Sequence, residues 1–182
     1  MVMRMWAQEM IDSNRDYEDW WTKAEQADVI VFDLDGTLVN SDVANFLSYK
    51  AAVLHILSSK MSNLEFNPGI RMTRDVLEKL IPSIDNEKIT QIVAEKELVC
   101  KQYLSRTILN ARLADIVERS KGKEIILATD SRKTRADMLL THHRLSDKFT
   151  WKVYKDSVDI RDKYARLIPR LLKENRSIGH LE

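Results

Sequence analysis

Two aspartates separated by one residue follow a short apolar run. The run is Val29 to Phe32, and the aspartates are Asp33 and Asp35. Two carboxylates this close repel each other and are costly to bury unless a partner compensates their charge. Magnesium suits this position because it prefers oxygen ligands and commonly binds one or two carboxylates together with a substrate phosphate. The spacing predicts a Mg²⁺ site at Asp33 and Asp35 and chemistry on a phosphorylated substrate.

Other polar residues follow the later apolar runs. Thr129 comes directly after Glu124 to Ala128, and Lys152, Lys155 and Lys163 lie in or after a third run. Gly36 allows a close backbone turn in which exposed amides can hold an anion.

The elements that must position these residues are short strands alternating with helices. We predict strands at 29–32, 124–128 and 149–154, and a fourth at 177–181. Between the later strands we predict one helix that follows Ser131 and runs through about His143, and another at 161–174. This order predicts an α/β fold with a Rossmann-like parallel sheet and right-handed crossovers. Ligands of such sheets bind outside the carboxyl ends of the strands, where the polar residues named above collect.

A long helical block separates the first two strands. Helical spacing predicts helices from Ser41 to about Ser59, from Arg71 to Leu80, from Ser83 or Asp85 to Tyr103, and at 111–120. One crossover needs far fewer residues, so we predict an inserted helical cap domain at 41–114. The α/β core then comprises 28–40 and 115–182, and 1–27 form a helical N-terminal extension.

Composition limits the function classes. The 182 residues hold 29 lysines and arginines against 28 aspartates and glutamates, so no overall field favours nucleic acid or an anionic membrane. No apolar stretch approaches the roughly 20 residues needed to span a bilayer. The N-terminus lacks the long uninterrupted apolar centre of a secretory signal sequence. The single cysteine, Cys100, can form no internal disulfide, which agrees with a small core residue in a reducing compartment. We expect a cytoplasmic enzyme without nucleic-acid or membrane partners.

The segment Asp33-Leu34-Asp35-Gly36-Thr37-Leu38 resembles the first motif of the haloacid dehalogenase superfamily of phosphotransferases. The apolar residues leading into Thr129 resemble its second motif, at a distance similar to that of members with a helical cap inserted after the first strand. The resemblance covers residues 28–182 and leaves the first 27 unexplained.

The resemblance implies a role for each matching residue. Asp33 would be the nucleophile that forms an aspartyl phosphate, and Asp35 the general acid and base. Thr129 would hold a phosphoryl oxygen; alternatively, Thr129, Asp130 or Ser131 caps the next helix. Gly36, Thr37 and Asp130 are further candidate substrate-binding residues.

Two features remain open. The phosphate-binding lysine is Lys163, where the third motif of the family usually falls, or Lys155 just past the third strand. A fourth motif should add acidic metal ligands, and only Glu182 stands at its expected place. Glu182 is either the first acid of that motif, which would leave the core C-terminally incomplete, or part of a cloning linker.

The predicted cap and N-terminus give weaker signals. Arg71 and Arg74 resemble a cap segment that faces the cleft and would bind an anionic substrate, or they are surface charges of a helix. We expect the Trp-rich N-terminus to pack on the main domain; the alternatives are a homo-oligomer contact and a substrate lid.

We therefore expect a magnesium-dependent phosphatase acting on a small phosphomonoester. The alternatives are a phosphomutase or other phosphotransferase of this superfamily, and a catalytically incomplete interaction domain that retains the fold. A dehalogenase is disfavoured because Asp35 supplies an acid that leaving alcohols need and halides do not.

Overall fold

The computed structural model describes residues 14–57 and 64–155. These residues divide into two compact units. One unit contains the described residues up to Asn40 and those from Leu109 onward, and it holds the sheet. The other unit is Ser41–Ile108 and is helical.

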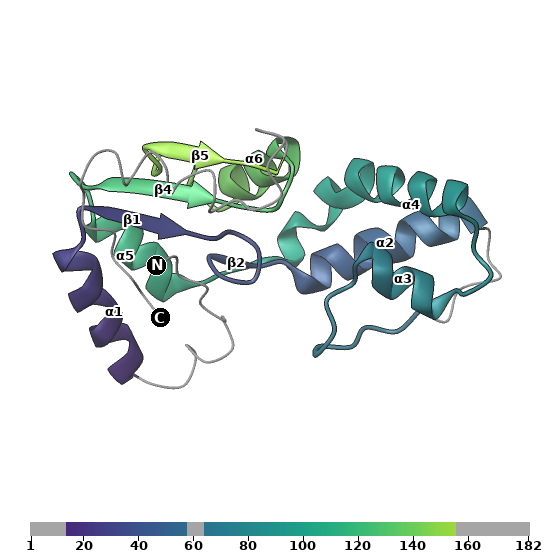
Figure 1. Ribbon diagram of the computed structural model, residues 1–182, viewed down its shortest axis with the longest axis horizontal. Helices are drawn as coiled ribbons and strands as arrows, with labels where there is room; N and C mark the ends of the chain where they lie inside the picture. Colours follow the sequence, from purple (N-terminus) through teal and green to yellow (C-terminus); the bar gives the residue numbers. More distant parts are fainter. Residues whose placement is uncertain (1–13, 58–63, 156–182) are drawn as a thin grey trace. The chain divides into compact units, whose positions relative to one another are not determined.

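The first unit is built on a three-stranded parallel sheet in the order β1-β4-β5. The strands are β1 (Val29–Phe32), β4 (Glu124–Ala128) and β5 (Trp151–Val153), and all three run in the same direction (Figure 1). Every residue of β1 is buried, as expected for an apolar run without alternation in a parallel sheet. The carboxyl ends of the three strands therefore meet at one edge.

Helices α1 (Asn14–Gln26), α5 (Ala111–Arg119) and α6 (Lys133–His142) complete this unit. Helix α1 packs against α5, where the Arg119 guanidinium lies 4.0 Å from the ring centre of Trp21 and also donates to the Tyr17 hydroxyl. A hydrogen bond from Tyr17 to Asp115 raises the pKa of the Tyr17 phenol. Trp20 is buried in the same unit, so α1, the described part of the N-terminal segment, packs on the sheet domain.

The second unit contains α2 (Asp42–Leu57), α3 (Arg74–Leu80), α4 (Asn86–Val99) and the 3₁₀ helix Cys100–Arg106. Thr73 caps the amino end of α3 by accepting from the Val76 amide, and Asp85 caps α4 by accepting from the Lys88 amide. The core of this unit is formed by apolar residues of α2, α3, α4 and the segment between α2 and α3: Phe46, Tyr49, Ala52, Val53, Leu64, Met72, Leu77, Ile81 and Ile92.

Several element boundaries differ from the predictions. The second helix of the block begins at Arg74, not Arg71, because Thr73 supplies its cap. The third gives way after Val99 to 3₁₀ turns, and the third strand is limited to Trp151–Val153, the residues that pair with β4. Two short strands, β2 (Val39–Asn40) and β3 (Ile108–Leu109), pair with each other and were not predicted.

The predicted domain boundary at residue 114 also differs from the observed division after Ile108. It falls inside α5, whose buried side chains pack in the sheet unit. Helical periodicity alone does not tell which unit a helix packs against. The predicted helix at 161–174 and strand at 177–181 lie outside the described residues. Within 14–57 and 64–155, no helix has the length and apolar character needed to cross a membrane.

Candidate active site

The loop after β1 holds the two aspartates at the carboxyl edge of the sheet. It is closed by backbone hydrogen bonds from Val39 to Leu34 at 2.9 Å and from Gly36 to the Val39 carbonyl at 2.9 Å. Gly36 adopts a φ of 78°, in the left-handed region that favours glycine. The sequence Asp-Leu-Asp-Gly therefore makes a tight turn in which Leu34 is fully buried and Asp33 and Asp35 are partly exposed.

The carboxylate of Asp35 is bonded at both oxygens to side chains that follow β4. Arg135 donates from Nη2 to Oδ1 at 2.8 Å and from Nη1 to Oδ2 at 3.2 Å. The hydroxyl of Ser131 donates to Oδ2 at 2.6 Å and accepts from Arg135 Nη1 at 2.7 Å. The side chain of Arg135 is 10% exposed and that of Asp35 is 13% exposed. This bidentate pair fixes the direction of the Asp35 carboxylate.

Thr129 lies at the end of β4, as the sequence predicts, and is fully buried. Its amide donates to the Val153 carbonyl of β5, and its hydroxyl oxygen accepts from the Ser131 amide at 3.1 Å. This second contact is a local turn bond and not a helix cap. The residue at the cap position of α6 is Arg132, whose side chain makes no capping bond, so the cap position is not occupied by Thr129, Asp130 or Ser131.

The candidate lysines are placed differently from one another. Lys155 is exposed just past β5, and its backbone amide donates to the Ser131 carbonyl at 3.1 Å, which brings it next to the loop after β4. The ammonium group of Lys152 donates a hydrogen bond to the Ser146 carbonyl at 2.6 Å. Lys163, like Glu182, lies outside the described residues, so the choice between Lys163 and Lys155 stays open.

The two arginines of the helical unit both have partners within that unit. Arg71 donates to Asp42 at 2.6 Å and lies 3.4–3.5 Å from the Ser41 hydroxyl. Arg74 is exposed and pairs with Glu78 one turn along α3, which corresponds to the surface-charge alternative. Substrate binding by either arginine stays a prediction.

The fit of a divalent cation to this site is partial. Asp33 stands at the strand end, where a cation ligand was predicted. The carboxylate of Asp35 does not fit that role, because Arg135 already compensates its charge at both oxygens. In the described ranges, no three His, Cys, Asp or Glu side chains come together as a metal site. Metal binding by Asp33 stays a prediction, and a complete site would require oxygen ligands in addition to its carboxylate.

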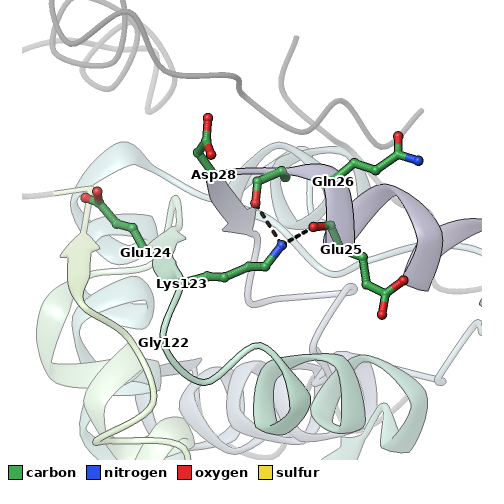
Figure 2. Close-up of a pocket in the computed structure, with 7 residues that line it drawn as sticks. Glu25, Gln26, Asp28, Gly122, Lys123 and Glu124 are labelled. Atoms are coloured by element: carbon green, nitrogen blue, oxygen red, sulfur yellow. Dashed lines mark hydrogen bonds between the residues drawn. The ribbon is translucent and has the colours of Figure 1, made fainter.

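A cavity of about 530 Å³ lies at the opposite edge of the sheet, before β1 and β4, and is lined by Glu25, Asp28, Lys123 and Glu124 among others (Figure 2). The ammonium of Lys123 donates there to the carbonyl oxygens of Ala24 at 2.8 Å, Ala27 at 3.0 Å and Glu25. These contacts satisfy the carbonyls at the end of α1. The cavity is remote from the polar strand exits, and its lysine stabilises a helix end.

Arg135 and Ser131 are the site residues that the sequence interpretation missed as partners of Asp35. A signal was present in the start of α6, where Arg132, Lys133 and Arg135 precede any acidic residue. Cations at the amino end of a helix oppose its dipole, which costs about 0.3–1 kcal/mol each when exposed. Such a cluster indicates that a nearby anion compensates it.

A second contact ties α6 to the end of β5. The Tyr154 hydroxyl donates to Asp137 at 2.7 Å, and Lys133 pairs with the same carboxylate. Burial raises the pKa of Asp137, but the hydrogen bonds from Lys133 and Tyr154 outweigh burial and leave it below its ordinary value. Helix α6 therefore contacts the loop after β1 through Arg135 and the residue just past β5 through Asp137.

The chain matches the family model described as haloacid dehalogenase-like hydrolase over residues 30–177. It therefore belongs to the haloacid dehalogenase-like hydrolase family. Searching the curated proteins by sequence returned no match.

Solved structures share the fold at low identity. A protein from Haemophilus somnus 129PT described as a "predicted phosphoglycolate phosphatase" has a TM-score of 0.63 at 17% identity, covering 82% of this chain and 72% of that one. A HAD-superfamily hydrolase of subfamily IA from Geobacter sulfurreducens PCA scores 0.60 at 16% identity, covering 82% and 74%. CbbY from Rhodobacter sphaeroides in complex with phosphate scores 0.62 at 17% identity, covering 81% and 73%. At these identities the similarity establishes the fold.

Proposed function

We propose that this protein is a phosphatase that hydrolyses a small phosphomonoester through an aspartyl phosphate on Asp33. The observation that carries this proposal is the meeting of Asp33, Asp35 and Thr129 at the carboxyl edge of one parallel sheet in a chain of this hydrolase family. The family resemblance supports the individual roles, and two of the similar structures described above are named for a phosphatase or hold phosphate.

In the first step, an oxygen of Asp33 attacks phosphorus. A P–O bond to Asp33 forms as the ester P–O bond breaks, and Asp35 gives a proton to the departing alcohol oxygen. In the second step, water attacks phosphorus, Asp35 takes a proton from that water, and the bond to Asp33 breaks. Inorganic phosphate leaves, and both carboxyl groups return to their starting state.

Thr129 would hold a phosphoryl oxygen, as the family resemblance implies, and its position at the end of β4, beside the turn that Ser131 closes, supports this role. The positive charge of Lys155 or Lys163 would lower the repulsion between the Asp33 carboxylate and the phosphate. Magnesium, implied by the family, would be held by Asp33 and would supply neutralisation of the phosphoryl charge. A small substrate is expected because the inserted helical unit resembles a cap that restricts access to the site.

The test is release of inorganic phosphate from 4-nitrophenyl phosphate and from a panel of small phosphorylated sugars and acids, with magnesium present. We expect turnover by the wild-type protein and a loss of more than about 10³-fold in Asp33→Asn, which preserves shape but removes the nucleophile. The variant Arg119→Lys, at the far end of the sheet domain, serves as a control with wild-type activity. Phosphate release that persists unchanged in Asp33→Asn would refute the proposal.

Two further measurements separate the alternatives. Adding a sugar acceptor distinguishes a phosphotransferase, which would pass the phosphoryl group to the sugar and release little inorganic phosphate. Acid quenching of the reaction with ³²P-labelled substrate should trap label on wild-type protein and none on Asp33→Asn. An enzyme that turns over without ever retaining label would contradict the covalent intermediate.

A further inference from the structure

We propose that Arg135, together with Ser131, is a positioning residue that holds the Asp35 carboxylate in its working direction. This inference rests on the phosphatase function proposed above and adds two residues to it. Neither belongs to the motif residues to which the family resemblance assigns a role.

The geometry of the guanidinium is the first support. Its two terminal nitrogens contact the two different oxygens of Asp35, at 2.8 and 3.2 Å, so the carboxylate is fixed in rotation as well as in distance. Ser131 adds a third donor on Oδ2 at 2.6 Å and is itself bound by Arg135. A carboxylate held by three donors cannot turn without breaking several bonds together.

Burial is the second support. Arg135 and Ser131 are 9% and 7% exposed, although arginine is almost never buried without a specific partner. Arg135 also lies in the first turn of α6, where the helix dipole disfavours a cation. The helix itself gives no reason for a buried arginine at this position, whereas the contact with Asp35 does.

The functional consequence follows from the role of Asp35 in proton transfer. A general acid or base contributes roughly 10²–10⁴-fold, and only when it is within hydrogen-bond reach of the reacting oxygen. A displacement of about 1 Å can cost about 10²-fold. In this assignment Arg135 does not touch the substrate and affects the reaction only by positioning Asp35. Loss of the Arg135 side chain should therefore lower kcat and leave KM nearly unchanged.

The test is a double-mutant cycle between Arg135→Lys and Asp35→Asn, measured as kcat and KM for an alkyl phosphate that wild-type protein hydrolyses. Lysine keeps the charge but cannot form the two-nitrogen contact. We expect Arg135→Lys to lower kcat by about 10- to 100-fold in the wild-type background. In the Asp35→Asn background, the same change should alter the residual kcat by less than about threefold, because the residue through which Arg135 acts is already gone.

Two additional variants keep the test decisive. Ser131→Ala should lower kcat less than Arg135→Lys and also have little effect in the Asp35→Asn background. Arg119→Lys is the matched arginine control, and it should retain wild-type kcat in both backgrounds. Circular dichroism identifies any variant that fails to fold, and Arg135→Gln replaces Arg135→Lys in the cycle if the latter does.

The outcomes separate this inference from the proposed function. An active wild-type protein, an inactive Asp33→Asn and an equal loss from Arg135→Lys in both backgrounds would leave the phosphatase assignment intact and overturn the positioning role. Wild-type kcat in Arg135→Lys, or a loss that appears only in KM, would also overturn it. Wild-type protein that hydrolyses none of the esters overturns both.

Discussion

Gly36 allows a direct test of the turn that presents the two aspartates. Its φ is 78°, and a Cβ built on it meets no heavy atom within 4 Å. An alanine therefore fits the space, and the cost of Gly36→Ala arises from the backbone conformation alone. That conformation costs an L residue about 1–2 kcal/mol.

The chain offers two matched glycines. Gly122 also has a positive φ, 96°, with no heavy atom within 4 Å of a Cβ, but it lies before β4 at the opposite edge of the sheet. Gly69 has no positive φ, and its Cβ would make an ordinary contact of 3.5 Å with Asn67. We expect a loss of about 1–2 kcal/mol in Gly36→Ala and Gly122→Ala. Gly69→Ala should be neutral or stabilising by up to about 1 kcal/mol, through the unfolded state.

Thermal unfolding followed by circular dichroism measures the stability difference. For a protein of this length, 1 kcal/mol corresponds to roughly 2–4 °C, so each of the two strained variants should lose about 2–8 °C in Tm. Phosphatase kinetics then separate them. Gly36→Ala moves the neighbours Asp35 and Thr37 and should lose at least about tenfold in kcat, whereas Gly122→Ala should keep wild-type kcat.

Two results would refute this reasoning. A Gly36→Ala protein with wild-type Tm would show that the turn does not require the left-handed conformation. An equal loss of kcat in Gly122→Ala would show that the effect on activity follows from lower stability and not from the geometry of the site.

Three further predictions concern stability. Arg135→Ala leaves the largely buried carboxylate of Asp35 without its main partner and should lower the free energy of unfolding by about 3–5 kcal/mol, measured by urea denaturation. Arg74→Ala, which breaks an exposed pair, should change the same free energy by about 0.5 kcal/mol or less. Lys123→Met removes the donor to three carbonyls at the end of α1 and should cost about 1–3 kcal/mol in the same assay; an unchanged midpoint would contradict the capping role. Burial lowers the pKa of His143 in the folded protein, so the unfolded chain binds the proton more tightly and stability should fall as pH drops through about 6.5. Between pH 7.5 and 5.5, wild-type Tm should therefore fall more than that of His143→Asn, and equal falls would contradict it.

The sequence predicted the buried strands well because their signal is local. Val29–Phe32 and Glu124–Ala128 are apolar runs of the type that parallel sheets bury on both faces, and both strands lie where they were predicted. The ends of helices and strands that depend on strand pairing or on a helix cap were harder to predict from the sequence. The length of β5 depends on which residues reach β4, and the start of α3 depends on the Thr73 cap. Helix α5 belongs to the sheet unit because it packs against α1. The helical periodicity of its own sequence does not show which unit it packs against.

The same distinction applies to the site. Asp33, Asp35 and Gly36 were found because these three residues within four positions form a motif, and Thr129 because it follows a buried strand. The partner of Asp35 could not be read in this way, since Arg135 is separated from it by 100 positions. Nothing in the local pattern distinguishes Arg135 from Arg132, three residues earlier, which is exposed.

The compensation of Asp35 by an arginine changes the electrostatic interpretation of the motif. From the sequence, two neighbouring carboxylates require a cation from solution to offset their repulsion. The structure supplies one of the two with a cation of the protein itself, carried by the helix that follows Thr129. The loop that carries Asp35 and the helix that follows Thr129 are therefore joined by a largely buried ion pair, and disturbing α6 should displace Asp35 as directly as disturbing its own loop. Residues of the chain itself therefore account for the direction of the Asp35 carboxylate, and we expect a metal at this site to be bound by the Asp33 side chain and not by that of Asp35.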